Sequence, residues 1–193
     1  MTLVLSEDFS APSALNRFKQ ARPDLGFKAG SADRPAWRVH EGKLIGEGAH
    51  NATLWLQEAM PDGDVRVTFT ARALSDEGDV KCEFAGDGAL HQSGYVLING
   101  GWKNSLRVIA RQDEHGEDRR EDRRCRAQKC APRDQEMRWA LERRGDVLSW
   151  YLDGQLTLRY VDHNPLRGQF FGFGNWSAPV AFDDLKVYRL EAR

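Results

Sequence analysis

Short runs of alternating apolar and polar residues recur along this chain from end to end, and sustained helical periodicity is hard to find. The alternation is clear at residues 65–72, 79–84, 106–111 and 147–152. A period of two is typical of β-strands, because successive side chains point to opposite faces of a sheet. Many short strands without intervening helices predict an all-β sandwich or barrel.

Turn residues bound most of these runs, as at Glu41-Gly42 and Asn164-Pro165. Residues 147–160 give the clearest hairpin, since Asp153-Gly154 suits a type I′ turn between two strands. The stretch from Ser10 to Pro35 is looser, and we expect a short helical turn in it around residues 14–19.

The chain has 193 residues, and we expect one domain spanning 1–193. Lys and Arg total 28 against 29 for Asp and Glu, so no global field directs the protein to nucleic acid or to a membrane surface. No apolar run reaches the ~18–20 residues of a membrane helix. The first residues lack a basic region and a long apolar stretch. We therefore expect either a cytoplasmic protein or one whose leader has been removed.

Residues 112–135 interrupt the strand pattern with a long polar loop. Acidic and basic residues alternate between 117 and 126, so the loop lacks the one-sided charge that phosphate binding uses. A self-paired solvated loop is the simplest interpretation, and a lid over an anionic sugar is the alternative. Cys125 and Cys130 lie here, and their spacing fits either a disulfide or two free thiols. Cys82 is expected to face the core.

Strand landmarks are spread over nearly the whole chain. They are Glu7-Asp-Phe9, Trp37-Arg-Val-His-Glu-Gly-Lys-Leu44, Trp150-Tyr-Leu-Asp-Gly154 and the closing stretches 168–174 and 180–187. Together they resemble concanavalin A-like lectin and glucanase domains, and within them the laminin-G-like and DUF1080-type (3-keto-disaccharide hydrolase-like) modules of bacterial glycan metabolism. The resemblance implies a two-sheet antiparallel β-sandwich, a jelly roll, that binds an oligo- or polysaccharide on its concave sheet face.

The glucanases of this superfamily carry paired carboxylates in a Glu-x-Asp-x-(x)-Glu strand, and no such strand occurs here. Glycan binding and glycan catalysis are therefore close competitors. An enzyme would be a glycoside hydrolase or a polysaccharide lyase using Glu83, Glu114 and His115. In the lyase version, His115 or Tyr95 is the base and Arg111 neutralises a uronate.

A candidate glycan site follows from side chains expected on neighbouring strands. Aromatic rings stack on the C–H faces of sugars, and planar polar groups bond their hydroxyls. Asp79, Lys81 and Glu83 share one strand face if Val80, Cys82 and Phe84 point into the core. The predicted site comprises Lys81, Glu83, Tyr95, Trp102, Asn104, Arg111, Glu114 and His115, with Trp176 at its rim. The simpler interpretation of Lys81 and Glu83 is a solvated face with a weak ion pair.

The remaining predictions concern other aromatic, imidazole and carboxylate groups. Four tryptophans are expected in the core or on sheet faces: Trp37, Trp55, Trp139 and Trp150. Four histidines show no catalytic or metal-binding spacing: His40, His50, His91 and His163. No cofactor is required, and a structural calcium is suggested near Asp183 with Glu7 or Asp8, although calcium takes about six to eight oxygen ligands. A third alternative, a laminin-G-like protein-interaction domain, would show an exposed apolar patch instead of a polar, aromatic-lined groove.

Overall fold

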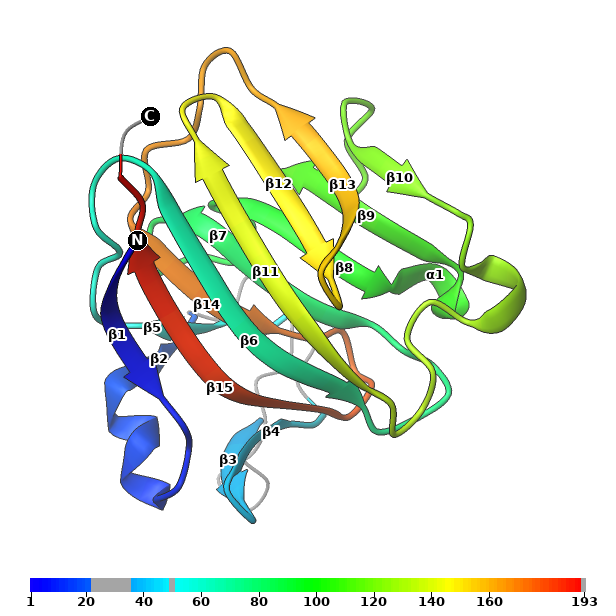
Figure 1. The fold of residues 1–193 in the computed structure, drawn as a ribbon. Helices are drawn as coiled ribbons and strands as arrows, with labels where there is room; N and C mark the ends of the chain where they lie inside the picture. The colour runs from blue at the N-terminus through cyan, green and yellow to red at the C-terminus, as the bar shows by residue number, and fades with distance from the viewer. Residues whose placement is uncertain (22–35, 49–50, 192–193) are drawn as a thin grey trace.

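The computed structural model describes residues 1–21, 36–48 and 51–191, which form two antiparallel sheets packed face to face (Figure 1). Sheet A contains, in spatial order, β13 (Gln155–Val161), β12 (Val147–Leu152), β11 (Glu136–Arg144), β6 (Val65–Ala73), β15 (Val180–Arg189), β4 (Lys43–Gly46) and β3 (Trp37–His40), with β1 (Thr2–Glu7) also paired to β15. Sheet B contains β10 (Arg120–Asp122), β9 (Leu106–Arg111), β8 (Tyr95–Gly100), β7 (Val80–Gly86), β14 (Phe170–Gly174), β5 (Leu54–Leu56) and β2 (Phe18–Gln20). The predicted two-sheet antiparallel β-sandwich is confirmed.

Helical structure is limited to short turns. They are η1 (Pro12–Arg17), α1 (Gly101–Asn104) and η2 (Arg126–Gln128). The first lies close to the helical turn predicted at residues 14–19. The rest of the looser stretch ending at Pro35 lies partly outside the described residues, at 22–35. None of the described helices is both long and apolar enough to span a membrane.

The main core lies between the two sheets and is rich in aromatic rings. Phe173 of sheet B stacks on Phe182 of sheet A with 4.4 Å between ring centroids. Trp139 and Trp150 stack at 4.6 Å and are buried, as predicted for these tryptophans. Burial of an apolar side chain of this size contributes about 1.5–3 kcal/mol. Cys82 also lies in this core.

Sheet B is buried on its outer face as well. Val96, Ile98, Val108 and Ala110 form a separate apolar cluster there. Strand alternation places them opposite Leu97 and Ile109, which belong to the main core. The alternation in residues 95–98 therefore separates two buried apolar faces, with Tyr95 and Leu97 in the main core and Val96 and Ile98 in the outer cluster. The sequence pattern does not distinguish such a strand from a half-buried one.

The β12–β13 hairpin matches the prediction. Asp153 and Gly154 have φ of +49° and +81°, and both values suit the central residues of a type I′ turn. An aspartate and a glycine are the residues that adopt these positive φ angles at least cost.

The predicted loop at 112–135 has more structure than expected. Its residues 120–122 form β10 beside β9, and Cys125 and Cys130 form a disulfide. Many of its charges neutralise one another, as the self-paired interpretation predicted: Arg119 and Arg123 pair with Glu121, and Arg124 pairs with Asp122.

One edge of the sandwich is closed by side chains. β10 and β13 lie side by side, each at the end of its own sheet. Tyr160 donates its hydroxyl hydrogen to Oδ2 of Asp118 at 2.7 Å, and the guanidinium of Arg120 lies 5.7 Å from the Tyr160 ring centroid. These contacts link the two sheets across the edge.

Candidate functional site

A cleft of about 660 Å³ opens at one end of sheet B, where β7 begins and β8 ends. Two tryptophans in its lining are partly exposed: Trp102 by 36% and Trp176 by 44%. The lining comprises Asp76, Glu77, Asp79, Lys81, Ile98, Gly100, Trp102, Lys103, Glu114, His115, Lys129, Trp176 and Ala178. We call this space the tryptophan cleft. It unites four residues of the predicted site, namely Lys81, Trp102, Glu114 and His115, with the rim residue Trp176.

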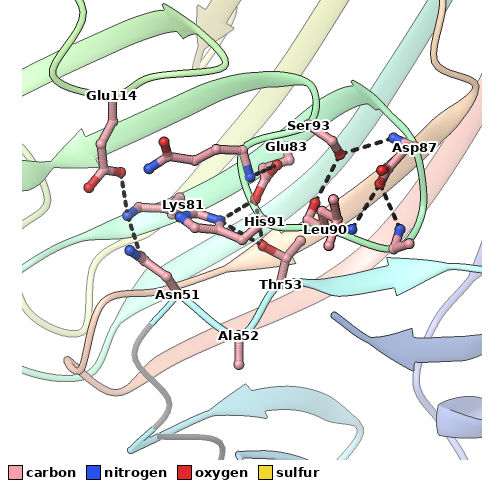
Figure 2. Close-up of polar contacts among 12 residues, drawn as sticks. Asn51, Ala52, Thr53, Lys81, Glu83, Asp87, Leu90, His91, Ser93 and Glu114 are labelled. Carbon is pink, nitrogen blue, oxygen red and sulfur yellow. Dashed lines mark hydrogen bonds and ion pairs between the residues drawn. The ribbon is translucent and has the colours of Figure 1, made fainter. Parts of the chain in front are cut away.

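Lys81 is a lysine with almost no solvent contact, 1% exposed, at the edge of the cleft. Its Nζ donates to Oε2 of Glu114 at 2.8 Å and to Oδ1 of Asn51 at 2.9 Å (Figure 2). Burial alone would lower the pKa of Lys81, but the charges of Asp79 and Glu114 outweigh it and raise the pKa. The ammonium group therefore stays charged within the fold.

Asp79 directly precedes β7 in a left-handed conformation, with φ of +60°. Its Oδ2 accepts a hydrogen bond from the backbone N–H of Trp176 at 2.5 Å. Burial raises the pKa of Asp79, and the charge of Lys81 opposes this effect while that of Glu114 adds to it. The cleft therefore contains two different carboxyl groups. Asp79 binds a proton more readily than an ordinary aspartate, whereas Glu114 is paired with Lys81.

Asp79, Lys81 and Glu83 have the i, i+2, i+4 spacing of the glucanase strand described above, with a lysine at its centre. Lys81 and Glu83 both face outward, since their partners on β8 are Ile98 and Val96 of the outer cluster. Lys81 places a positive charge between Asp79 and Glu83, at the position where the glucanase strand has a third acidic residue. The spacing alone therefore does not reproduce the glucanase carboxylate pair.

Trp102 lies on the α1 turn, whose backbone is left-handed. The φ angles of Trp102, Lys103 and Asn104 are +49°, +61° and +58°. Such conformations cost non-glycine residues about 1–2 kcal/mol each. Asn104 holds the turn, because its Nδ2 donates to the carbonyls of Asp76 and Ala131 and its Oδ1 accepts from the N–H of Ala131. A strained turn that its surroundings hold in place is a frequent feature of functional sites.

The indole of Trp102 is supported by two neighbours from loop 112–119. The guanidinium carbon of Arg119 lies 4.9 Å from the indole centroid, in a cation–π contact. The imidazole of His115 meets the indole edge to face at 5.6 Å, and its Nε2 lies 3.7 Å from Oε1 of Glu114. His115 is itself exposed, so it can reach a bound molecule.

Glu83 is completely buried and does not line the cleft. Its carboxylate accepts from the hydroxyl of Thr53 at 2.5 Å and the N–H of Gln92 at 2.9 Å, and it lies 2.6 Å from Nδ1 of His91 (Figure 2). The solvated face with a Lys81–Glu83 ion pair is therefore wrong. Glu114 pairs with Lys81 and not with Glu83, so the two carboxylates of the hydrolase hypothesis have different partners.

Three predicted sugar contacts lie outside the cleft. In the strand register, Tyr95 on β8 lies opposite Phe84 on β7, whose side chain points into the main core. Arg111 on β9 lies opposite Tyr95. The Tyr95 hydroxyl and the Arg111 Nε both donate to Oδ2 of Asp162, at 2.7 and 2.8 Å. Strand alternation thus directs both side chains away from the outer face. Asn104 is buried and supports the α1 turn.

The suggested calcium position is surrounded by ion pairs. Asp183 bonds to Nζ of Lys43 at 2.9 Å, and Glu7 bonds to Arg17 at 2.9 Å. Among residues 1–21, 36–48 and 51–191, no group of three or more His, Cys, Asp or Glu side chains is placed to hold a metal ion. A calcium near Asp183 stays a prediction from the sequence resemblance.

Several residues of this region have no distinctive sequence signal. Asn51 binds Lys81 from 30 positions away, and its own N–H donates to the carbonyl of Asn175 in the loop that carries Trp176. His91 reaches Glu83 only because residues 87–93 fold back over the outer face of β7. Asp79 differs from them, because its spacing of two residues from Lys81 indicated that it lies on the same face as Lys81 and Glu83.

Solved structures share this arrangement of strands over almost the whole chain. A structure reported with endo-acting O-glycanases of the human gut microbiota, which initiate mucin breakdown, superposes with a TM-score of 0.70 at 14% identity and covers 98% of this chain and 100% of its own. A Bacillus licheniformis beta-glucanase gives 0.66 at 11% identity, covering 98% and 99%. The fold is the concanavalin A-like jelly roll.

A carbohydrate-binding module, CBM66 from Bacillus subtilis, also superposes, with a TM-score of 0.59 at 14% identity over 90% of this chain and 96% of the module. No protein-family model and no curated protein sequence matches the chain. The jelly-roll fold predicted from the strand landmarks is therefore confirmed. The finer likeness to laminin-G-like or DUF1080-type modules stays a prediction.

Proposed function

We propose that this protein binds an oligo- or polysaccharide in the tryptophan cleft. The observation that carries the proposal is the pair of partly exposed tryptophans, Trp102 and Trp176, beside the carboxyl groups of Asp79 and Glu114. Indole rings suit the C–H faces of sugar rings, and carboxylates accept hydrogen bonds from sugar hydroxyls. Glucanases and a carbohydrate-binding module among the structures of the same fold support this assignment.

The mixture of aromatic and charged side chains in the cleft favours a sugar over a protein partner. A laminin-G-like interaction domain would present a contiguous apolar patch. Within the described part of the chain, the large exposed apolar side chains outside the cleft include Leu3 and Val4 on β1, Leu90 in the loop 87–93, and Leu156 and Val161 on β13. They are spread over different elements, whereas the aromatic and polar groups of the cleft converge on one space.

The test is a glycan array combined with titration calorimetry on purified protein. We expect Trp102→Ala and Trp176→Ala each to weaken binding of the best array ligand at least about fivefold, because stacking of one ring on an aromatic side chain contributes about 1–3 kcal/mol where it is known for nucleic-acid bases. Leu156→Ala, at an exposed apolar residue of sheet A, is the matched control and should leave affinity unchanged. Unchanged affinity in both tryptophan variants would exclude the cleft as the binding site.

Hydrolysis of the bound glycan is a second candidate function, supported by the two carboxyl groups of the cleft. Asp79, whose pKa is raised by burial, is suited to donate a proton to the glycosidic oxygen. Glu114 would then activate a water molecule or attack the anomeric carbon. This version replaces Glu83 by Asp79 in the predicted carboxylate pair, and it keeps His115 beside Glu114.

Mass spectrometry of incubated glycans tests hydrolysis. Asp79→Asn and Glu114→Gln should each abolish turnover while ligand binding persists. Products that have gained water indicate hydrolysis, whereas unsaturated products indicate elimination. Tyr95 and Arg111 lie away from the cleft, so a lyase reaction would rest on His115 alone as base. Turnover that survives in Asp79→Asn would contradict the role given to that carboxyl.

The Cys125–Cys130 disulfide bears on the compartment. Disulfides persist mainly in oxidising environments, such as the periplasm or the extracellular space. Of the two alternatives drawn from the sequence, the disulfide favours an exported protein over a cytoplasmic one.

A further inference from the structure

We propose that the tryptophan cleft receives the end of a glycan chain and does not bind a chain that runs across the sheet. This inference rests on the proposed glycan-binding function and concerns which part of a glycan is recognised. It follows from what covers the outer face of sheet B on both sides of Lys81.

A first barrier lies over β7, next to Lys81 along the strand. Glu83 is wholly buried and contacts the imidazole of His91 (Figure 2). The His91 side chain is itself only 5% exposed. On the neighbouring strand β14, Gly172 faces Glu83, and the side chains of Thr53 and Trp55 fill the space above that glycine. A sugar ring therefore has no access to this part of the face.

The loop that carries His91 is held closed by its own hydrogen bonds. Oδ1 of Asp87 accepts from the N–H groups of Ala89 and Leu90. The hydroxyl of Ser93 accepts from the N–H of Asp87 and donates to the carbonyl of Leu90. Because these bonds lie within residues 87–93, the loop keeps its shape without a ligand.

A second barrier lies over β8 and β9. Glu114 follows β9 in the chain but pairs with Lys81 on β7, so loop 112–119 has to pass over β8. The apolar side chains beneath, Val96 and Val108 among them, have no solvent exposure. The route across the strands is therefore covered as well.

A third contact joins two exposed residues of the cleft lining. Lys129, in the loop closed by the disulfide, pairs with Asp76 in the β6–β7 loop at 2.7 Å. The volume of the cleft, about 660 Å³, is that of a pocket for one small ligand, a class that spans about 300–1,000 Å³. A few sugar residues at a chain terminus fit this space, and the rest of the chain would extend into solvent.

The inference is tested by calorimetric titration with oligosaccharides of increasing length and with cyclic glucans, which have no chain ends. The probes are linear gluco-, galacto- and N-acetylglucosamine oligosaccharides from disaccharide to octasaccharide, together with α-1,4-linked and β-1,2-linked glucans in matched linear and cyclic forms. In any series that binds, we expect affinity to stop rising by the trisaccharide or tetrasaccharide. For the glucans that bind, the cyclic form, which has no ends, should bind at least tenfold more weakly than the linear form.

Two results would overturn the inference and leave glycan binding intact. One is affinity that keeps rising to the octasaccharide, and the other is a cyclic glucan that binds as tightly as its linear partner and loses that binding in Trp102→Ala. Failure of every series to bind would remove the proposed function and this inference together. Leu156→Ala again serves as the variant in which the length profile should not change.

Discussion

Nζ of Lys81 and Oε2 of Glu114 lie 2.8 Å apart, although an entire strand, β8, separates the strand of one from the loop of the other. Both side chains are largely removed from water. The ion pair fixes loop 112–119 on the outer face of sheet B and positions one carboxylate of the cleft. Its removal should therefore affect both the stability of the fold and the shape of the site.

Replacement of Lys81 tests how strongly this pair supports the fold. We expect Lys81→Met to lower the free energy of unfolding by about 3–5 kcal/mol, because it leaves the carboxylate of Glu114 buried without its partner. The double variant Lys81→Met/Glu114→Gln should lose less. Urea denaturation measures both, with Arg138→Met at the exposed Arg138–Asp153 pair as control. Equal losses in the single and double variants would contradict this account.

Asp79 should make stability depend on pH. Its folded-state pKa lies above the ordinary aspartate value of 3.8. Its contribution to stability is therefore fully present below about pH 3.8 and is lost as pH rises through the raised pKa. We expect Asp79→Asn to remove this loss, because an amide oxygen can still accept from the N–H of Trp176. Melting temperatures of the two proteins should therefore diverge in favour of the variant as pH rises from about 4 to about 7. If the two plots of melting temperature against pH ran parallel, the pKa of Asp79 would not be shifted by folding.

Asn104 is expected to act on the site through the α1 turn. Asn104→Ala removes three hydrogen bonds to main-chain groups and the residue type that best tolerates a left-handed conformation. We expect a loss of about 1–3 kcal/mol in unfolding free energy, since the buried groups of Ala131 lose their partner. The affinity for the array ligand should fall as well. Tyr95→Phe, a buried polar change outside the cleft, should leave affinity unchanged.

The disulfide closes a short loop of the same region. Reduction, or the paired change Cys125→Ser/Cys130→Ser, should lower the free energy of unfolding by about 2 kcal/mol, as loop-closure entropy predicts for a separation of five residues. Thiol titration of the unfolded, unreduced protein should find only Cys82 reactive. Three reactive thiols would show that the bridge does not form.

The sequence predicted the fold class well because alternation and turn chemistry are local. The Asp153-Gly154 hairpin and the burial of Cys82 needed only the period of the strand and the preference for positive φ. Tyr95 and Arg111 were expected at the sugar site but lie outside the cleft, because alternation separates two faces without identifying which one is outward. On β8 both faces are apolar, so hydrophobicity does not identify the outward face either.

The site was predicted only in part because its main contacts are long-range. Trp102 and Trp176 stood out as aromatic residues in glycine-containing turns, and both line the cleft. Asn51, by contrast, meets Lys81 through a separation that no local pattern encodes. His91 was set aside for lack of a motif, yet it covers Glu83 because a self-bonded loop returns over β7.

The contacts of Tyr160 on β13 with Asp118, just before β10, and with Arg120 of β10 have a consequence for assembly. An open terminal strand is a template to which another chain can add a strand, which is a common route to fibrils and exchanged dimers. Here the outermost strands of the two sheets shield each other with side chains. Sheet extension by a second copy of the chain is therefore directed away from β10 and β13.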